Sequence, residues 1–368
     1  MYCADCESLD QYFFESTRFW MFLPTGESVQ KALAFLSACG FENTRKAQHC
    51  LVVTVPERRI KEFLLGLYGE LEPPELGKTK ITTSRDDSLS LEDTGRIVTA
   101  QVLISRFNGT WLVDIIEQER YETHFQTIYE VDGDNQAHPF AFEGLLRLKD
   151  ENDNYLSPAH VFRAAGDADL LFSLDLAARR SAVSHFAKAG LRGKLFINFN
   201  PSSIYDPAYC LRTTASAINA LGIDASDVVF EITETHSVRN ESVMKGILSF
   251  YRNSGFGVAL DDIGSGYSGL NMLHKFKPDY VKIDMDLIRD LHTDPYKQVI
   301  VQHLIEIAHQ NGVLVIAEGV ENKEELNALR RYEPDFYQGF YFSRPVAMPA
   351  NTSEERQREI DNYLRGVR

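Results

Sequence analysis

The chain has no hydrophobic run that approaches the roughly 20 apolar residues of a membrane-spanning helix. Its first segment, MYCADCESLDQYFFESTRFW, lacks both a basic start and a continuous apolar stretch, so it does not predict a signal peptide. Cysteine is also sparse: five in 368 residues, an odd number without regular spacing, do not indicate the disulfide framework of a secreted domain. We therefore expect a cytoplasmic protein with mostly reduced thiols.

Positive charge is the next deficit, because 38 Lys and Arg residues face 53 Asp and Glu residues and leave a net charge of −15. Such a balance argues against general binding to nucleic-acid polymers or to anionic membranes, which requires a basic face. An anionic substrate would need local positive charge, from metal ions or from a few placed basic side chains. The remaining composition, 44% hydrophobic and 25% charged, is that of an ordinary globular protein. The length allows two domains.

The segment before about residue 110 predicts a small α/β module. Apolar spacing of three and four indicates helices at 28–40 and 57–71, and apolar runs indicate strands at 18–23, 48–55 and 78–84. The polar stretch 84–95 predicts a linker, and a helix is expected at about 111–121. We interpret residues 1–110 as a regulatory or sensory domain of unknown type, although scaffolding or dimerisation fits equally well. Residues 111–368 form the second predicted domain.

Four thiol and imidazole groups in the first module leave three alternatives open. Cys3 and Cys6 form a CxxC pair, and His49 and Cys50 follow later in the chain. Together they could bind zinc, although their spacing matches no familiar zinc pattern. They could also form a redox switch, or be ordinary thiols.

The second domain alternates strands and helices. One predicted helix, at about 294–312, places Ile300, Leu304 and Ile307 on one stripe. Eight strands in alternation with helices predict a (β/α)8 barrel. The link between the first two strands, DGDNQAHP, is too short for a crossover helix, so these two strands are expected to pair antiparallel. The predicted strands are 125–131, 140–148, 194–200, 228–233, 257–263, 280–285, 314–320 and 337–342.

Nearly every predicted strand carries a polar residue in its later half. In a barrel of this type the carboxyl ends of the strands form the rim on which active sites are built. Carboxylate and amide oxygens gathered there suit Mg²⁺ or Mn²⁺, and no cluster of His or Cys accompanies them to favour zinc. These residues are Glu143, Asn198, Glu231, Asp261 with Asp262, Lys282, Glu318 and Gln338.

Asp261 and Asp262 are adjacent, and unneutralised carboxylates in such a position repel each other. At a strand end the alternation of side chains relaxes, so each carboxylate can reach a different ion. Two ions about 3.5–4 Å apart are the arrangement used for in-line displacement at phosphorus. Lys282 fits this site as a cation near an attacking water or as a clamp on phosphate.

Seven sequence motifs, in the order in which they occur along the chain, together resemble one protein family. FEGLLR (142–147) is followed by INFN, FEITET, LDDIGSGYSGL, VKID, IAEGVE and QGFYFSRP, and the series closely resembles the EAL-domain phosphodiesterases over roughly residues 120–346. The resemblance implies a modified, usually dimeric (β/α)8 barrel. It also implies hydrolysis of the bacterial messenger cyclic di-GMP to linear pGpG with two Mg²⁺ or Mn²⁺ ions per site.

The resemblance also assigns roles to residues. Glu143, Asn198, Glu231, Asp261 and Glu318 would bind metal, and Asp262 would hold the second ion. Lys282 would lie beside the nucleophilic water, and Glu143, Asp261, Asp262 and Glu318 would act with it in catalysis. Arg147 would contact a substrate phosphate, and Gln126, Gln338 and Leu145 would lie near the nucleotide or the metal-bound waters. Glu234, Glu321 and Asp284 would support the ligands and the glycine-rich loop after Asp262.

Several positions depart from the usual pattern. Gly144 replaces alanine, Ile263, Ser265 and Gly269 replace Phe, Thr and Ser, Thr127 replaces proline, and Gly166 replaces glutamate. None of these changes removes a metal ligand, so we expect an active enzyme. Two alternatives remain: an inactive receptor that binds cyclic di-GMP without cutting it, and a divalent-metal barrel enzyme of another class, such as an enolising lyase.

Overall fold

The computed structural model describes residues 12–134, 136–168, 170–200, 207–233, 241–266 and 269–348. The chain divides into two compact units, one of residues 1–118 with 157–173 and one of residues 119–156 with 174–368. Cys3, Cys6 and Glu234 lie outside the described residues. Within the described part, no helix is both long and apolar enough to cross a membrane.

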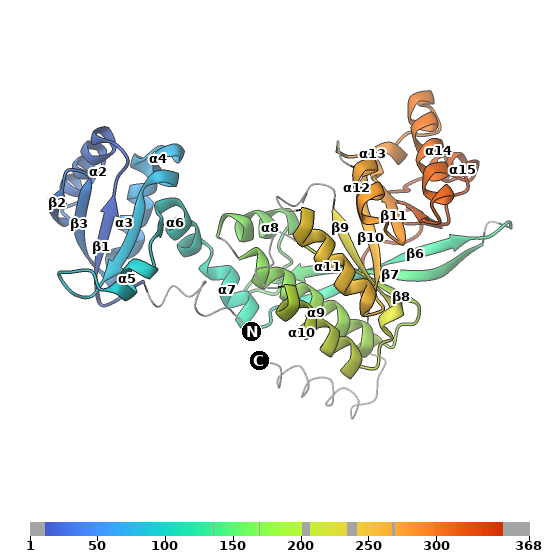
Figure 1. The fold of residues 1–368 in the computed structure, drawn as a ribbon, viewed down its shortest axis with the longest axis horizontal. Coiled ribbons are helices and arrows are strands. Elements are labelled where there is room, and N and C mark those ends of the chain that lie inside the picture. Colours follow the sequence, from blue (N-terminus) through green and yellow to red (C-terminus); the bar gives the residue numbers. More distant parts are fainter. Residues whose placement is uncertain are drawn as a thin grey trace. The chain divides into compact units, whose positions relative to one another are not determined.

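The first unit is an antiparallel sheet covered by helices (Figure 1). The strand order is β2-β3-β1-β4-β5. Alternation along β1 buries Phe19 and Met21, which lie opposite Val53 and Leu51 of β3. The strands are β1 (Ser16–Phe22), β2 (Glu42–Ala47), β3 (Cys50–Pro56), β4 (Lys80–Ser84) and β5 (Val98–Thr99). The helices are α2 (Gly26–Ala38), α3 (Ile60–Glu70), α4 (Pro73–Lys78), α5 (Leu91–Gly95), α6 (Ala100–Asn108), α7 (Thr110–Glu117) and α8 (Pro158–Asp167).

Part of this unit was missed by sequence reasoning. Strand β2 reads ENTRKA and is mostly exposed at the edge of the sheet, so it carries no hydrophobic signal. Residues 84–95 contain the short helix α5, and the apolar segment that follows forms helix α6. The helix expected at 111–121 is α7, and the chain is already a strand at Tyr121.

The second unit is a closed eight-stranded barrel, which confirms the predicted fold class. As predicted, β6 runs antiparallel to β7, and β7 to β12 each pair parallel with the next strand. Tyr337 of β13 pairs with Tyr129 of β6 and closes the barrel. The strands are β6 (Tyr121–Val131), β7 (Ala137–Leu148), β8 (Lys194–Asn198), β9 (Val228–Thr233), β10 (Gly257–Ile263), β11 (Tyr280–Ile283), β12 (Leu314–Ala317) and β13 (Phe336–Tyr337), with β14 (Val346–Ala347) added on β6.

The last barrel strand is shorter than the predicted strand 337–342. Gly339 packs against the backbone of Val320, and a side-chain Cβ placed there would lie 2.1 Å from the Val320 carbonyl oxygen. The chain turns at this contact, so β13 ends at Tyr337 and Gln338 follows it.

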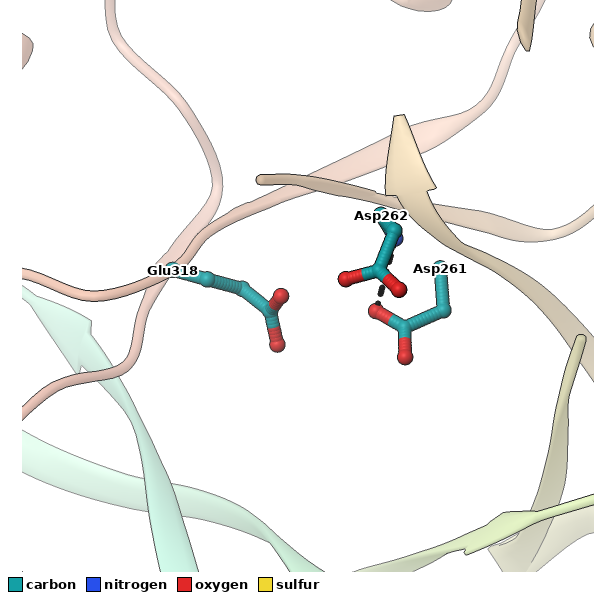
Figure 2. Close-up of side chains that lie close together, drawn as sticks. All are labelled: Asp261, Asp262 and Glu318. Carbon is teal, nitrogen blue, oxygen red and sulfur yellow. Dashed lines mark hydrogen bonds between the residues drawn. The ribbon is translucent and has the colours of Figure 1, made fainter. Parts of the chain in front are cut away.

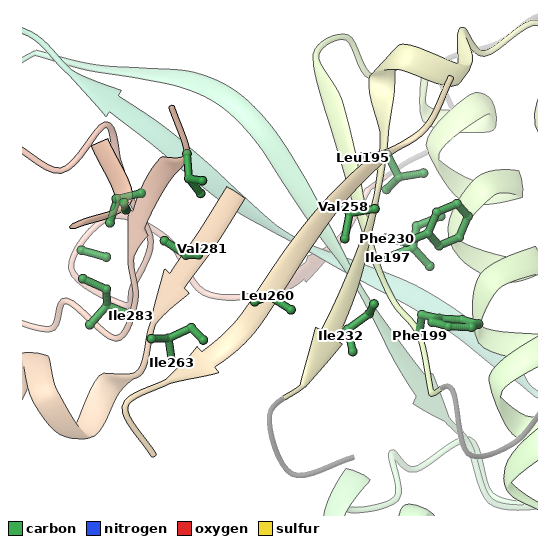
Figure 3. Close-up of a cluster of buried hydrophobic side chains, with 14 of the residues drawn as sticks. Leu195, Ile197, Phe199, Phe230, Ile232, Val258, Leu260, Ile263, Val281 and Ile283 are labelled. Carbon is green, nitrogen blue, oxygen red and sulfur yellow. The ribbon is translucent and has the colours of Figure 1, made fainter. Parts of the chain in front are cut away.

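Helices cover the outside of the barrel, and apolar side chains fill the layer between the two (Figure 3). The predicted stripe of Ile300, Leu304 and Ile307 was wrong for the buried face of α14. That face presents Val301, Ile305 and Ala308, whereas Ile300 and Ile307 are exposed. The helices are α9 (Leu171–Ala189), α10 (Pro207–Ala220), α11 (Glu241–Asn253), α12 (Gly269–Phe276), α13 (Met285–Ile288), α14 (Pro295–Gln310) and α15 (Lys323–Leu329).

The barrel interior holds one apolar layer to which each strand contributes one residue. Because side chains alternate along a strand, the residue two positions further on points into the same interior. In β7 to β13 that next residue is polar, and in the antiparallel β6 the polar residue is Gln126, two positions before Ile128. The apolar layer therefore supports a polar layer at the carboxyl ends of the parallel strands. The apolar layer consists of Ile128, Ala141, Phe196, Val229, Ala259, Tyr280, Ile316 and Phe336.

Gly144 points outward from β7, next to Glu143 of the polar layer. A Cβ at this position would lie 2.9 Å from the Ala182 Cβ on α9. We therefore expect Gly144→Ala to lower the free energy of unfolding by about 1–3 kcal/mol, since an added methyl forces the helix and the strand apart. Chemical denaturation of the variant measures this loss.

Two companion variants test the cause. In the double variant Gly144→Ala/Ala182→Gly, about 1 kcal/mol of the free energy of unfolding that Gly144→Ala loses should be recovered. If the effects of the two substitutions simply add, the contact between residues 144 and 182 is not the cause of the loss. Gly166→Ala is the control, because its Cβ would meet little beyond Leu171 at 3.9 Å. It should stabilise α8 by about 0.5–1 kcal/mol.

Candidate metal centre

The polar layer at the carboxyl end of the barrel gathers eight residues that the sequence had singled out. Each follows a residue of the apolar layer by two positions, or precedes it in the antiparallel strand β6. Most of these side chains are buried. The layer consists of Gln126, Glu143, Asn198, Glu231, Asp261, Lys282, Glu318 and Gln338.

Lys282 is the cation of this layer, and four carboxylates surround it. Its Nζ lies 2.6 Å from Glu318 Oε1, 2.7 Å from Glu231 Oε1, 3.3 Å from Glu143 Oε2 and 3.6 Å from Asp261 Oδ1. The lysine side chain is only 1% exposed, so water does little to screen these interactions. One positive charge faces four potential negative charges, which leaves the cluster short of cations.

Two side-chain amides hold Glu143. Asn198 Nδ2 donates to Glu143 Oε1 at 2.9 Å, and Gln338 Nε2 donates to Glu143 Oε2 at 2.7 Å. Gln338 Nε2 also lies 3.2 Å from Gln126 Oε1, and Gln126 Nε2 donates to the Ser343 carbonyl oxygen. The bonds of Gln126 to Gln338 and Ser343 cross the place where β13 meets β6 and closes the barrel. Because Gln338 also holds Glu143, barrel closure and the orientation of Glu143 depend on the same side chain.

A β-bulge explains how two adjacent aspartates serve one site. Leu260 pairs with Val281 and Ile263 pairs with Ile283, so Asp261 and Asp262 together lie opposite Lys282 alone. Asp262 takes a left-handed backbone conformation with φ of 58°, which aspartate tolerates better than most residues. Its amide donates to Asp261 Oδ1 at 2.9 Å. The bulge therefore cancels the alternation that would send the two carboxylates to opposite sides.

Asp261, Asp262 and Glu318 form a group of carboxylates that could hold an ion (Figure 2). One oxygen from each lies within 4.8 Å of the other two. Figure 2 shows Glu318 extending from the chain after β12 toward the two aspartates at the end of β10.

Burial makes negative charge costly for most of these carboxylates. It raises the pKa of Glu231 and of Glu318 well above the ordinary value, even though Lys282 opposes the shift. Burial likewise raises the pKa of Asp261. Burial, helped by the neighbouring Asp261 and Asp284, raises the pKa of Asp262 to about 7. The site thus holds protons when nothing else balances its charge.

The pKa values of Glu143 and Lys282 both shift in the direction that favours the charged form. Burial alone would raise the pKa of Glu143, but Lys282 and the amides of Gln338 and Asn198 hold it below the ordinary value. Burial likewise disfavours the lysine cation, yet the surrounding carboxylates raise the pKa of Lys282 well above its ordinary value. A charged Glu143–Lys282 pair is therefore the fixed part of the cluster.

A pocket of about 260 Å³ opens beside these residues. Eight of its lining residues had been predicted for the site: Gln126, Glu143, Leu145, Asp262, Asp284, Glu318, Glu321 and Gln338. Sequence reasoning missed the other four, which are Met285, Gly319, Gly339 and Phe340. Gly319, Gly339 and Phe340 lie within the quoted motifs, and the apolar Met285 carries no signal of its own.

Glu321 and Asp284 line this pocket, whereas Arg147 does not. Arg147 follows Glu143 on β7, is half-buried and donates to the Leu146 carbonyl oxygen. Glu321 pairs with Arg289 at 2.7 Å. Asp284 caps α13 by accepting from the Asp286 amide at 2.9 Å.

The donor set fits hard divalent cations. Carboxylate and amide oxygens predominate, which suits Mg²⁺ or Mn²⁺. Glu231 is fully buried, and its Oε2 has no hydrogen-bond partner among the described residues. A buried carboxylate oxygen left in this state is costly unless a cation or proton meets it. The carboxylates of Asp261, Asp262 and Glu318 are thus consistent with a metal site.

Comparison with known proteins agrees with this architecture. The family model described as EAL domain matches residues 110–345. The probable cyclic di-GMP phosphodiesterase PdeG of Escherichia coli K12 is 32% identical over 213 residues. That match covers 55% of this chain and 41% of PdeG, so the chain spans less than half of this relative.

Solved structures share the fold. The c-di-GMP-bound standalone versatile EAL protein from Vibrio cholerae O395 is 32% identical with a TM-score of 0.55, over 64% of this chain and 96% of that one. The manganese/cy-diGMP complex of Klebsiella pneumoniae BlrP1 is 22% identical with a TM-score of 0.56, over 90% of this chain and 96% of that one, and so shows likeness of fold alone. With the family model matched across the barrel and its polar layer, this chain belongs to the EAL domain family.

Proposed function

We propose that this protein hydrolyses cyclic di-GMP to linear pGpG with two Mg²⁺ or Mn²⁺ ions, and so lowers the cellular level of this messenger. The observation that carries the proposal is the bulge that brings Asp261 and Asp262 together beside Glu318, within a complete polar layer. The relative PdeG, named a probable cyclic di-GMP phosphodiesterase, and the c-di-GMP-bound relative from Vibrio cholerae support the choice of substrate.

The residues that would hold the two ions fall into two groups, and Asp261 belongs to both. Glu143, Asn198, Glu231 and Asp261 would hold the first ion, and Asp261, Asp262 and Glu318 the second. When bound, such ions activate a water and stabilise the charge that develops on phosphate oxygens. Gln338 and Gln126 fix the orientation of Glu143, so they act on the first ion through that carboxylate.

Lys282 and Arg147 supply the charge that the chain itself offers to an anionic substrate. Lys282 is held between Glu231 and Glu318, where its ammonium can orient the attacking water. Arg147 is four residues beyond Glu143 on the same strand face, with Leu145 of the pocket between them. A guanidinium at this place can bind a phosphate oxygen of the substrate.

The alternative is a receptor that binds cyclic di-GMP without turnover. Every carboxylate that the resemblance assigns to metal is present, four in the polar layer and Asp262 in the bulge beside it, which favours the enzyme. The replacements at Ile263 and Gly144 leave the ligands in place. The replacement of phenylalanine by the smaller Ile263, next to Asp262, is the feature that favours the receptor.

We also propose that the barrel forms a homodimer. Residues 1–110 are proposed to regulate turnover by the barrel. Helix α14 carries an exposed apolar stripe of Tyr296, Val299, Ile300 and Ile307, opposite its buried face. A twofold interface requires a self-complementary surface of this kind. The first unit has a core of its own, which suits a separate regulatory domain. Turnover of the full chain compared with that of a chain starting near residue 108 measures its effect.

The central prediction concerns turnover. Purified protein with cyclic di-GMP and Mg²⁺ or Mn²⁺ should form linear pGpG, measured by chromatography. Glu143→Gln should lower turnover by about 100-fold or more, because it removes a buried charge that holds the first ion. The exposed Glu324→Gln is the matched control and should leave turnover unchanged. Binding without product in the native protein would support the receptor and contradict the enzyme.

The pH dependence of stability follows from Asp262. An aspartate in the unfolded chain releases its proton near pH 4, whereas the folded, metal-free protein holds this proton up to about pH 7. Folded metal-free protein should therefore lose stability relative to Asp262→Asn as pH rises from about 4 to about 7. Thermal unfolding of both proteins at fixed ionic strength measures the difference. A difference that stays constant with pH would contradict the proximity of the acids, and Mn²⁺ should stabilise the native protein most at the upper end.

The dimer has its own test. Sedimentation velocity should find a dimer for the native chain and a monomer for Val299→Lys/Ile300→Lys, since two charges on the stripe oppose apolar contact. Leu65→Lys/Tyr68→Lys, on exposed apolar positions of the first unit, is the control and should remain dimeric. A native chain that sediments as a monomer at micromolar concentration would rule the dimer out.

A further inference from the structure

Helix α9 carries a charged pair on the face that packs against the barrel. Ala182, Val183 and Phe186 of this face belong to the barrel's outer core. Asp175 and Arg179 continue the same stripe toward the start of the helix, at the spacing of i and i+4. The Arg179 side chain is fully buried. Burying two charges costs several kcal/mol per ion, and apolar residues would serve packing better.

The contacts of this pair join three segments of the barrel unit. Arg179 Nη2 lies 2.8 Å from Asp175 Oδ2, and Arg179 Nη1 donates to Thr214 Oγ1 of α10 at 3.0 Å. Asp175 Oδ1 accepts from the backbone amide of Asn200 at 3.0 Å. The guanidinium carbon also lies 5.6 Å from the centre of the Phe199 ring. The pair thus holds the two residues that follow strand β8.

Strand β8 ends at Asn198, a member of the polar layer. Beyond it the backbone is held on both sides, because the Phe199 amide donates to the Glu231 carbonyl oxygen at 2.9 Å and the Asn200 amide donates to Asp175. Asn198 Nδ2 is committed to Glu143 Oε1. This bond orients the amide so that its oxygen is left to accept from, or bind, another group, and the position of that oxygen depends on where the backbone places Asn198.

We propose that Asp175 and Arg179 form a positioning element for Asn198 and thereby set the affinity of the first divalent ion. The inference rests on the proposed metal function. Asp175 acts through its bond to the Asn200 amide, and Arg179 orients the Asp175 carboxylate and ties it to Thr214 of α10. Groups that orient metal ligands from behind commonly contribute 10- to 100-fold in metal affinity.

Two neutral double variants separate this role from simple stabilisation. Asp175→Asn/Arg179→Met keeps an acceptor for the Asn200 amide, whereas Asp175→Leu/Arg179→Met lacks one, and both variants replace the two charged side chains together. Mn²⁺ affinity of the metal-stripped full chain is read from the electron paramagnetic resonance signal of free Mn²⁺. The Asn/Met variant should bind within about threefold of the native chain, and the Leu/Met variant about 10- to 100-fold more weakly. If the Leu/Met variant does not fold, Asp175→Ala/Arg179→Met replaces it.

Two controls fix the mechanism. Asp335→Leu removes a carboxylate that accepts from the Val315 amide at 2.7 Å, near the start of β12, and should lower stability without changing Mn²⁺ affinity. In an Asn198→Ala background, the Leu/Met change should weaken binding by less than about twofold, because its effect passes through Asn198.

The outcomes are distinct. A native chain that binds no Mn²⁺ overturns the proposed function and this inference with it. Native binding with an unchanged Leu/Met variant overturns the positioning role alone. Equal losses in the Asn/Met and Leu/Met variants overturn it too, since the bond to Asn200 would then not matter.

Discussion

The interior of this barrel depends on the attraction between Lys282 and the carboxylates that surround it. The ammonium lies within 3.6 Å of four carboxylates. Because these groups are mostly buried, their attraction is stronger than it would be between the same charges in water. The single positive charge of Lys282 does not balance all of these carboxylates. The pKa values of Glu231, Glu318 and Asp262 are raised for this reason and because the groups are buried. We propose that divalent cations supply the missing charge, so the buried carboxylates that are costly in the metal-free protein are the groups that would bind the ions.

Backbone geometry decides which side chains meet at this cluster. Alternation along the strands lifts one polar residue above each member of the apolar layer, and the bulge in β10 adds Asp262 to the set. The pocket-lining glycines let neighbouring segments approach closely: a Cβ on Gly319 would lie 2.3 Å from that of Met285. The site is thus a product of regular strands, one irregular strand and tight connections after them.

Much of this could be predicted from the sequence, for identifiable reasons. The period of two in apolar strands places Glu143, Asn198, Glu231 and Asp261 on one interior face, and the short link after β6 requires an antiparallel start. Three features escaped. Strand β2 lies at a polar edge, the buried stripe of α14 is offset by one residue from the predicted one, and Met285 reaches the pocket through tertiary packing. No local sequence pattern reveals a polar edge strand or a contact made by a loop residue. Nor does a local pattern show which of two apolar stripes on a helix faces the core.

We propose that paired divalent cations balance the charge of the polar layer. Anomalous diffraction at the manganese edge, from crystals of metal-stripped protein soaked in Mn²⁺, tests this proposal. Two peaks are expected about 3.5–4 Å apart, one touching Glu143, Glu231 and Asp261 and the other touching Asp261, Asp262 and Glu318. Crystals that take up Mn²⁺ elsewhere but show no peak against Glu143, Glu231 or Asp261 would contradict it.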